Sequence, residues 1–196
     1  MIDVRGGREP RASSAARSRR DTFARQENEL RQFYARLHTD LGEAVRLARA
    51  SADQPVLVKA LKALGQIERD AGHAQASLAR YEEAVAICRD IGDPVALAHT
   101  VRHVGDLHLS AGRPALAEPC FDEALALYRA DDATAPLDLA NTIRPYALLK
   151  EELGLATEAN ALWLETRSLY AQVGIDVGVE ECDAHLAALA AQPDDA

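Results

Sequence analysis

The chain has 196 residues, of which 48% are hydrophobic and 27% are charged. This length suffices for one sizeable domain or one elongated array, and it excludes two full-size domains. There are 39 alanines and 25 leucines, whereas only 5% of the residues are aromatic, so the composition favours an all-α protein.

The net charge of −9 is unevenly distributed along the chain. Residues 1–20 contain six arginines and two acidic residues, whereas the rest contains 16 basic and 29 acidic residues. An acidic body of this kind disfavours binding to nucleic acid or to an anionic membrane. Because residues 1–20 lack apolar periodicity and hold two adjacent glycines and a proline, we expect a disordered basic tail there.

The cysteines and the hydropathy pattern bear on the compartment. Cys88, Cys120 and Cys182 lie far apart and form no CxxC motif, so neither a disulfide framework nor a zinc ribbon is indicated. No apolar run approaches the length that a bilayer requires, so we expect no transmembrane helix. The N-terminus also lacks the apolar segment of a secretory signal. A reducing cytoplasm is the expected location.

The first element in chain order is one long amphipathic helix, predicted over residues 21–50. No proline interrupts it. Its apolar residues recur at three-, four- and seven-residue steps, the spacing of one helix face: Phe23, Leu30, Phe33, Leu37, Leu41, Ala44, Val45 and Ala48. Residues 41–50 share the EAV core of residues 81–90, so this helix is expected to cap an array of repeats as the second helix of an incomplete unit.

Three segments of the remaining chain align with one another without gaps. Residues 61–88 superpose on residues 101–128 with a shift of 40, and these superpose on residues 143–170 with a shift of 42. A period of this length indicates a solenoid of repeated units. We place the three units at residues 55–93, 94–134 and 135–175.

Each aligned column holds residues with one physical role. Small residues that let paired helices approach closely are Gly65, Gly105 and Ala147. Glycines that end the first helix and permit a turn are Gly72, Gly112 and Gly154. Aromatic residues that fill the gap between paired helices are Tyr81, Phe121 and Trp163. Prolines suited to a helix start are Pro55, Pro94 and Pro136. Each unit is therefore predicted as a helix, a short glycine turn and a second helix.

A last amphipathic helix is predicted over residues 176–191. The apolar residues that mark it are Val179, Cys182, Leu186 and Leu189. It is expected to cover the end of the array as a C-terminal cap.

The small-residue, glycine-turn, alanine and aromatic columns over residues 55–172 resemble the tetratricopeptide (TPR) repeat family. The long units resemble the longer repeats of kinesin light chains, and the chain is also similar to stand-alone bacterial TPR proteins. The tryptophan of the family's first helix is absent here. The resemblance implies an all-α, right-handed α-α superhelix over residues 21–196, with three helix pairs and a capping helix at each end.

The resemblance also implies a concave groove, lined mainly by the first helix of each unit. The candidate groove residues left after the core columns are removed are Lys59, Lys62, Gln66, His99, Arg102, His103, Asp106, Asn141 and Arg144. Because Lys62, Arg102 and Arg144 share one column, they would form a cationic stripe suited to an extended acidic peptide or a carboxylate. The alternative is that these three residues are solvated charges that balance nearby acidic residues.

Acidic residues concentrate on the predicted second helices, where they are expected to form an acidic outer face. They are Glu82, Glu83, Glu118, Asp122, Glu123, Glu158 and Glu165. The charge pattern thus assigns acid to the outer helices and a short basic stripe to the inner ones.

The predicted function is a non-catalytic scaffold that binds a protein segment. No phosphate-binding glycine loop or hydrolase motif occurs, so we expect neither an enzyme nor a cofactor. One alternative is a regulatory module that self-associates through its terminal helices as a homo-oligomer, or that acts beside a separate effector protein. Another is a metal site at His99, His103 and Asp106, whose spacing suits metal ligands but lacks a supporting motif.

Overall fold

The computed structural model describes the backbone of residues 14–191, with side chains at Thr22 and from Arg25 onward. This part of the chain is helical and contains no strand, which confirms the all-α fold. The helices are α1 (Ser14–Ala50), α2 (Gln54–Asp70), α3 (Ala74–Ile91), α4 (Pro94–Ser110), α5 (Pro114–Arg129), α6 (Pro136–Glu152), α7 (Ala156–Gln172) and α8 (Asp176–Ala190). Within these residues, no helix combines the length and the hydropathy that a membrane span requires.

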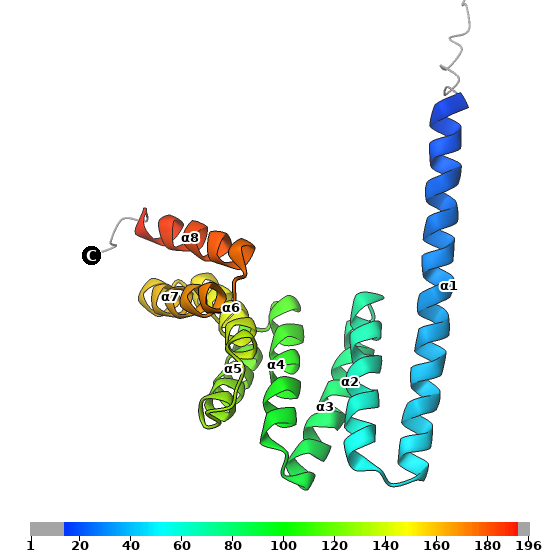
Figure 1. The fold of residues 1–196 in the computed structure, drawn as a ribbon, viewed down its shortest axis with the longest axis horizontal. Helices are drawn as coiled ribbons and strands as arrows, with labels where there is room; N and C mark the ends of the chain where they lie inside the picture. The colour runs from blue at the N-terminus through cyan, green and yellow to red at the C-terminus, as the bar shows by residue number, and fades with distance from the viewer. Residues whose placement is uncertain (1–13, 192–196) are drawn as a thin grey trace, which may run out of the picture.

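The helices form a solenoid of antiparallel pairs, α2 with α3, α4 with α5, and α6 with α7 (Figure 1). Helix α1 stands at one end and packs on α2, and α8 packs on α7 at the other end. The axes of successive pairs rotate along the array, so α7 and α8 run across the direction of α1 and α2 (Figure 1).

Helix α1 begins earlier than the sequence predicts. It starts at Ser14 rather than residue 21, so residues 14–20 continue the helix instead of belonging to a tail. Alanine and arginine are strong helix formers, which explains this extension through a segment that lacks an apolar stripe. The rest of the predicted tail, residues 1–13, lies outside the described residues.

The start and end signals of the repeats are confirmed. Prolines 55, 94 and 136 stand in the first turn of α2, α4 and α6. The Asp53 carboxylate accepts a hydrogen bond from the Val56 amide at 3.1 Å, and Asp93 caps α4 in the same way. The three predicted turn glycines have φ values of +81°, +65° and +72°, a backbone conformation that residues with a side chain rarely adopt.

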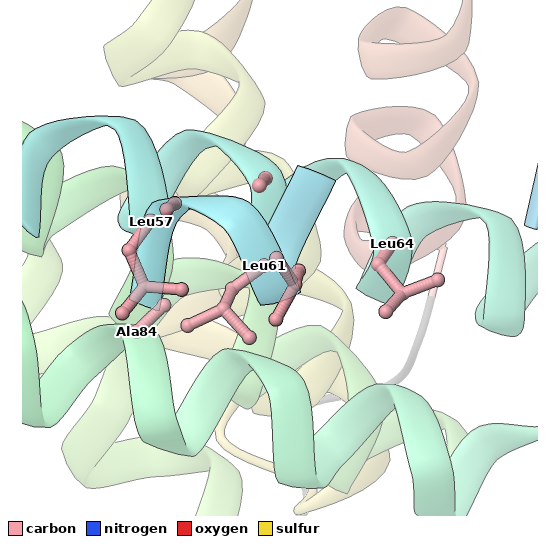
Figure 2. Close-up of a cluster of buried hydrophobic side chains, with 7 residues drawn as sticks. Leu57, Leu61, Leu64 and Ala84 are labelled. Atoms are coloured by element: carbon pink, nitrogen blue, oxygen red, sulfur yellow. The ribbon is translucent and has the colours of Figure 1, made fainter. Parts of the chain in front are cut away.

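The core runs along the array as a series of clusters between neighbouring helices. In the first cluster Leu57, Leu61 and Leu64 lie along α2, and Ala84 of α3 lies beside Leu57 (Figure 2). The aromatic column fills the centre of each pair, where Tyr81, Phe121 and Trp163 are at most 1% exposed. The hydrophobic core therefore has no single centre, and each helix pair depends on its neighbours for burial.

An unpredicted ladder of ion pairs joins the second helices. Each rung joins an arginine in the last turn of one helix to a glutamate of the next: Arg49 to Glu83, Arg89 to Glu123, and Arg129 to Glu165, with closest N–O distances of 2.6, 2.8 and 2.8 Å. Three of the seven predicted outer acids are thus neutralised, and the predicted acidic face is correspondingly weaker.

Candidate functional site

A pocket of about 340 Å³ opens between α4 and α6, with one wall from α2. Its lining residues are Arg69, Arg102, Asp106, Leu109, Ser110, Asn141, Arg144, Pro145 and Leu148. It brings together four of the nine predicted groove residues, and all of them come from first helices. Arg69 was missed because it lies in the last turn of α2, beyond the columns read for the groove.

Arg102 is the central cation of this pocket and is held from several directions. Its side chain is 15% exposed. Its Nη1 donates to the backbone oxygen of Asn141 at 3.3 Å, which ties α4 to α6. Its Nη2 lies 2.9 Å from Nε2 of His103, and Nη1 lies 3.7 Å from Oδ2 of Asp106. The guanidinium is therefore fixed in place, as a recognition group must be.

His103 acts as a neutral connector between the charged groups. Burial lowers its pKa, although the bond to Asp106 acts in the opposite direction. The Nε2 atom lies 2.9 Å from Nη2 of Arg102, and because a guanidinium only donates, Nε2 accepts this bond. The Nδ1 atom lies between an acid and a second guanidinium, 3.3 Å from Oδ2 of Asp106 and 3.5 Å from Nη1 of Arg69. The ring also packs on Tyr81, with 5.1 Å between centroids.

The second arginine of the pocket, Arg69, is oriented by its own helix. Its Nη2 donates to Oε1 of Gln66 at 2.7 Å. Gln66 in turn donates from Nε2 to Oδ1 of Asp70 at 2.8 Å. Gln66, predicted as a groove residue, therefore supports Arg69.

Arg144 already has a carboxylate partner. It donates through Nε to Oε2 of Glu181 in α8 at 2.7 Å, and a second bond joins its Nη2 to Oε1. These bonds hold the pKa of Glu181 below its usual range. The three predicted stripe cations are thus not equivalent, because the capping helix neutralises the last of them.

Lys62 differs from Arg144 because it is a half-buried cation that has no ion-pair partner among the described residues. Burial lowers its pKa, and the nearby positive charge of Arg102 lowers it further. His99 lies close by; burial first, and then Lys62, lowers its pKa to about 3. Its Nδ1 is buried without a hydrogen-bond partner. Lys62 is therefore a half-buried positive charge beside the neutral ring of His99 and the guanidinium of Arg102, and Asp93 and Asp138 act on it only from beyond ion-pair distance.

Of the two remaining candidates, Asn141 lines the pocket and Lys59 does not. Lys59 is exposed on α2. The Oδ1 of Asn141 accepts a hydrogen bond from the Tyr170 hydroxyl at 3.2 Å, so its side chain is anchored to α7.

The geometry gives no support to the metal-site alternative. Among residues 14–191, no group of three or more His, Cys, Asp or Glu side chains could hold a metal ion. The rings of His99 and His103 meet edge to face, 4.7 Å apart between centroids. Both nitrogens of His103 are engaged by charged neighbours, so the spacing that suggested ligands serves the polar network instead.

Comparisons with known proteins give one family-model match and several similar folds. Residues 57–130 match the model of the tetratricopeptide repeat. The fold is similar to the crystal structure of BtubC (BKLC) from P. vanneervenii, with a TM-score of 0.63 and 15% identity over 86% of this chain and 80% of that one. A putative kinesin light chain from Podosopora anserina, with nearly identical TPR-like repeats, gives a TM-score of 0.43 and 14% identity over 87% of this chain and 98% of that one. No curated protein matches the sequence.

Sequence identities this low establish likeness of fold and nothing about partners. The repeat match covers the first two helix pairs, and the aligned columns continue through the third. With the solenoid of antiparallel pairs and the positive-φ glycine turns, these findings show that residues 57–130 form tetratricopeptide repeats within a helical solenoid.

Proposed function

We propose that the groove formed by α2, α4 and α6 binds an extended acidic segment of a partner protein, and that the chain acts as a non-catalytic scaffold. TPR repeats generally mediate protein–protein interactions, and the repeat match supports this role. The finer proposal rests on one observation, the half-buried Lys62 that lacks a counter-ion beside Arg102.

A carboxylate is the group that best matches this environment. A cation removed from water loses solvation, and only an opposite charge or hydrogen-bond acceptors at close range restore it. Lys62 forms no ion pair among the described residues; Asp93 and Asp138 offset its charge only from a greater distance, and the neighbouring Arg102 adds like charge. A carboxylate between the two would satisfy both, whereas a basic segment would be repelled.

The pocket next to these cations can accommodate the rest of such a segment. Leu109, Pro145 and Leu148 provide apolar wall, and Arg69 supplies a further cation. Arg144 contributes less to the proposed contact because Glu181 occupies it. The segment would therefore lie with its acidic side chains toward Lys62, Arg69 and Arg102.

The test uses the full chain and a fluorescein-labelled peptide of about ten alternating Glu and Ser residues, which extends over ~33 Å. A peptide with Gln in place of Glu is the matched control. Fluorescence anisotropy is expected to show binding of the Glu peptide only, weakened about tenfold or more by Lys62→Glu or Arg102→Glu. Arg113→Glu, at an exposed turn position, is expected to retain binding. Equal binding of both peptides, or equal loss in all three variants, would contradict the proposal.

A further inference from the structure

Helix α1 occupies the position of a second helix, but no first helix accompanies it among the described residues. Elsewhere each second helix packs against the first helix of its own unit and the first helix of the next. Helix α1 packs on the latter, α2, its last turn also reaches α3 through the pair of Arg49 with Glu83, and its N-terminal half extends past α2 (Figure 1). One long face of α1 is therefore open.

Burial at aligned positions locates this open face. Helix α2, the first helix of the same unit, covers three residues of α3. These are Ser77, Tyr81 and Ala84, which are 0%, 1% and 0% exposed. The positions one repeat earlier, in α1, are Leu37, Leu41 and Ala44, and each remains only half-buried.

Three large apolar side chains of α1 are more than half exposed. Leu30 is 56% exposed, Phe33 57% and Leu47 52%. At 3.6 residues per turn, they share one side of the helix with Leu37 and Ala44, with the spacing of a two-helix seam. The seam continues over the part of α1 that packs on α2.

We propose that this open face of α1 pairs with the same face of α1 in a second copy of the chain, with the two helices antiparallel. Each α1 then lies where the first helix of a unit would pack on the other. The arrangement continues the antiparallel pairing of α2 with α3, α4 with α5, and α6 with α7.

One register suits the sizes of the apolar side chains. It places Leu30 against Leu47 of the second copy, and the large Phe33 against the small Ala44. Leu30, Phe33 and Leu47 of one helix then meet apolar partners on the other, as the packing of a two-helix seam requires, whereas Leu37 lies opposite Asp40 of the second copy.

The same register suits the charges beside the seam. Arg36 and Glu43 flank the seam seven residues apart, so Arg36 comes beside Glu43 of the second copy on both sides of the two-fold axis. Within the single chain Glu43 accepts from Arg46, an exposed pair that leaves this carboxylate accessible to a second arginine. Asp40, the polar residue of the seam, follows Arg36 by one helical turn, so the same arginine can also reach it.

Other registers are opposed by charge. A shift of one heptad in one direction brings Arg36 beside Arg36 and Glu43 beside Glu29 of the second copy. A shift in the other direction brings Glu43 beside Glu43. Like charges at flanking positions disfavour a pairing, so the pattern selects one antiparallel register.

The chain's own first residues are a poor alternative cover for this face. Residues 1–13 contain two glycines, a proline and only three large apolar residues, Met1, Ile2 and Val4. They cannot supply an apolar stripe that matches the length of the seam. A second α1 supplies one with complementary charge.

Sedimentation equilibrium of the full chain at ~1–100 µM is the first test. A species of twice the 21.2 kDa chain mass is expected. The double variant Leu30→Asp/Phe33→Asp is expected to be monomeric with unchanged helical circular dichroism, because both side chains are exposed in the single chain. Leu164→Asp, 52% exposed on α7, is the matched control and is expected to stay dimeric. A monomeric wild-type chain overturns the proposal. The open face of α1 would then be a binding surface for a different protein.

Charge reversal tests the register. Glu43→Arg is expected to weaken dimerisation about tenfold, and Arg36→Glu/Glu43→Arg in one chain is expected to restore it. Dimerisation unchanged by Glu43→Arg contradicts the register.

Cross-linking tests the direction in a Cys120→Ser background, where the other two cysteines are buried. A mixture of Leu30→Cys and Leu47→Cys chains is expected to form a disulfide-linked dimer on oxidation. Leu30→Cys alone is expected to form none, because its two copies lie about 25 Å apart along the pair. Efficient cross-linking of Leu30→Cys alone would show a parallel pair and overturn the proposal.

Discussion

The ring of Phe121 lies directly against the backbone of Gly105. A Cβ atom at Gly105 would come within 2.9 Å of the Phe121 Cε1 atom and 3.2 Å of the Cys120 Cβ atom. Gly65 and Tyr81 stand in the same relation one unit earlier, with 2.9 Å to Cε2. The close approach of paired helices in the first two units thus depends on the absence of one carbon atom.

Gly105→Ala is accordingly expected to destabilise the protein by about 1–3 kcal/mol, because the added methyl group forces α4 and α5 apart. Gly42→Ala is the matched control, since an added Cβ atom there meets nothing within 4 Å. It is expected to raise the free energy of unfolding by about 0.5–1 kcal/mol through helix propensity. Urea unfolding followed by circular dichroism measures both. Equal effects would contradict the packing argument.

The ion-pair ladder between second helices should contribute little. Arg89→Gln is expected to lower the free energy of unfolding by roughly 0.2–1 kcal/mol, because both partners are substantially exposed. A double-mutant cycle with Glu123→Gln isolates the pair, and about 1 M salt should abolish most of the coupling. Coupling that persists at high salt would contradict this view of the ladder.

Acid should destabilise the groove region through His99. Burial lowers the pKa of His99 from 6.5 to about 3, so the folded chain binds fewer protons than the unfolded chain between these values. Stability is therefore expected to fall as pH falls from 6.5 toward 3. His99→Gln should show a shallower fall in urea unfolding over that range. Identical pH slopes in the two proteins would exclude this role.

Alkali should destabilise the core through two tyrosines. Burial raises the pKa of Tyr128 and of Tyr146 from 10 to about 12. The folded chain then holds protons that the unfolded chain has lost, so the free energy of unfolding falls as pH rises from 10 to 12. Tyr128→Phe should flatten part of this dependence. A stability that does not change over that range would contradict the assigned burial.

Lys150 should be a costly residue to replace. It is 6% exposed, and its Nζ lies 2.6 Å from Oε1 of Glu118 and 2.7 Å from Oε2 of Glu158. Burial alone would lower its pKa, but the two carboxylates raise it above its usual range. Lys150→Met leaves these carboxylates without their shared cation, so a loss of about 1–3 kcal/mol is expected in thermal or urea unfolding. A neutral substitution would contradict the importance of the cluster.

The repeat explains what could be predicted from the sequence. Prolines, turn glycines and aromatic residues recur at fixed offsets, so each copy supports the assignment of the others, and the structure places them as expected. The ion-pair ladder has a comparable pattern in the sequence, because its arginines recur at the period of the first two units: Arg49, Arg89 and Arg129.

The site was less predictable because its state depends on contacts outside the repeat pattern. The pairing of Arg144 with Glu181 comes from the capping helix, which belongs to no aligned unit. Lys62 has no ion-pair partner among the described residues. This depends on which side chains other helices bring near it, and an aligned column does not show that. The columns therefore named four of the residues that line the pocket but not which of its cations already have partners.

The central claim is that the first-helix groove receives an acidic segment. The most direct measurement is a two-dimensional ¹H–¹⁵N NMR titration of the full chain with the alternating Glu and Ser peptide. The account predicts shift changes concentrated around Lys62, His99 and Arg102, and none with the Gln peptide. Changes confined to α3, α5 and α7, or no changes at all, would contradict it.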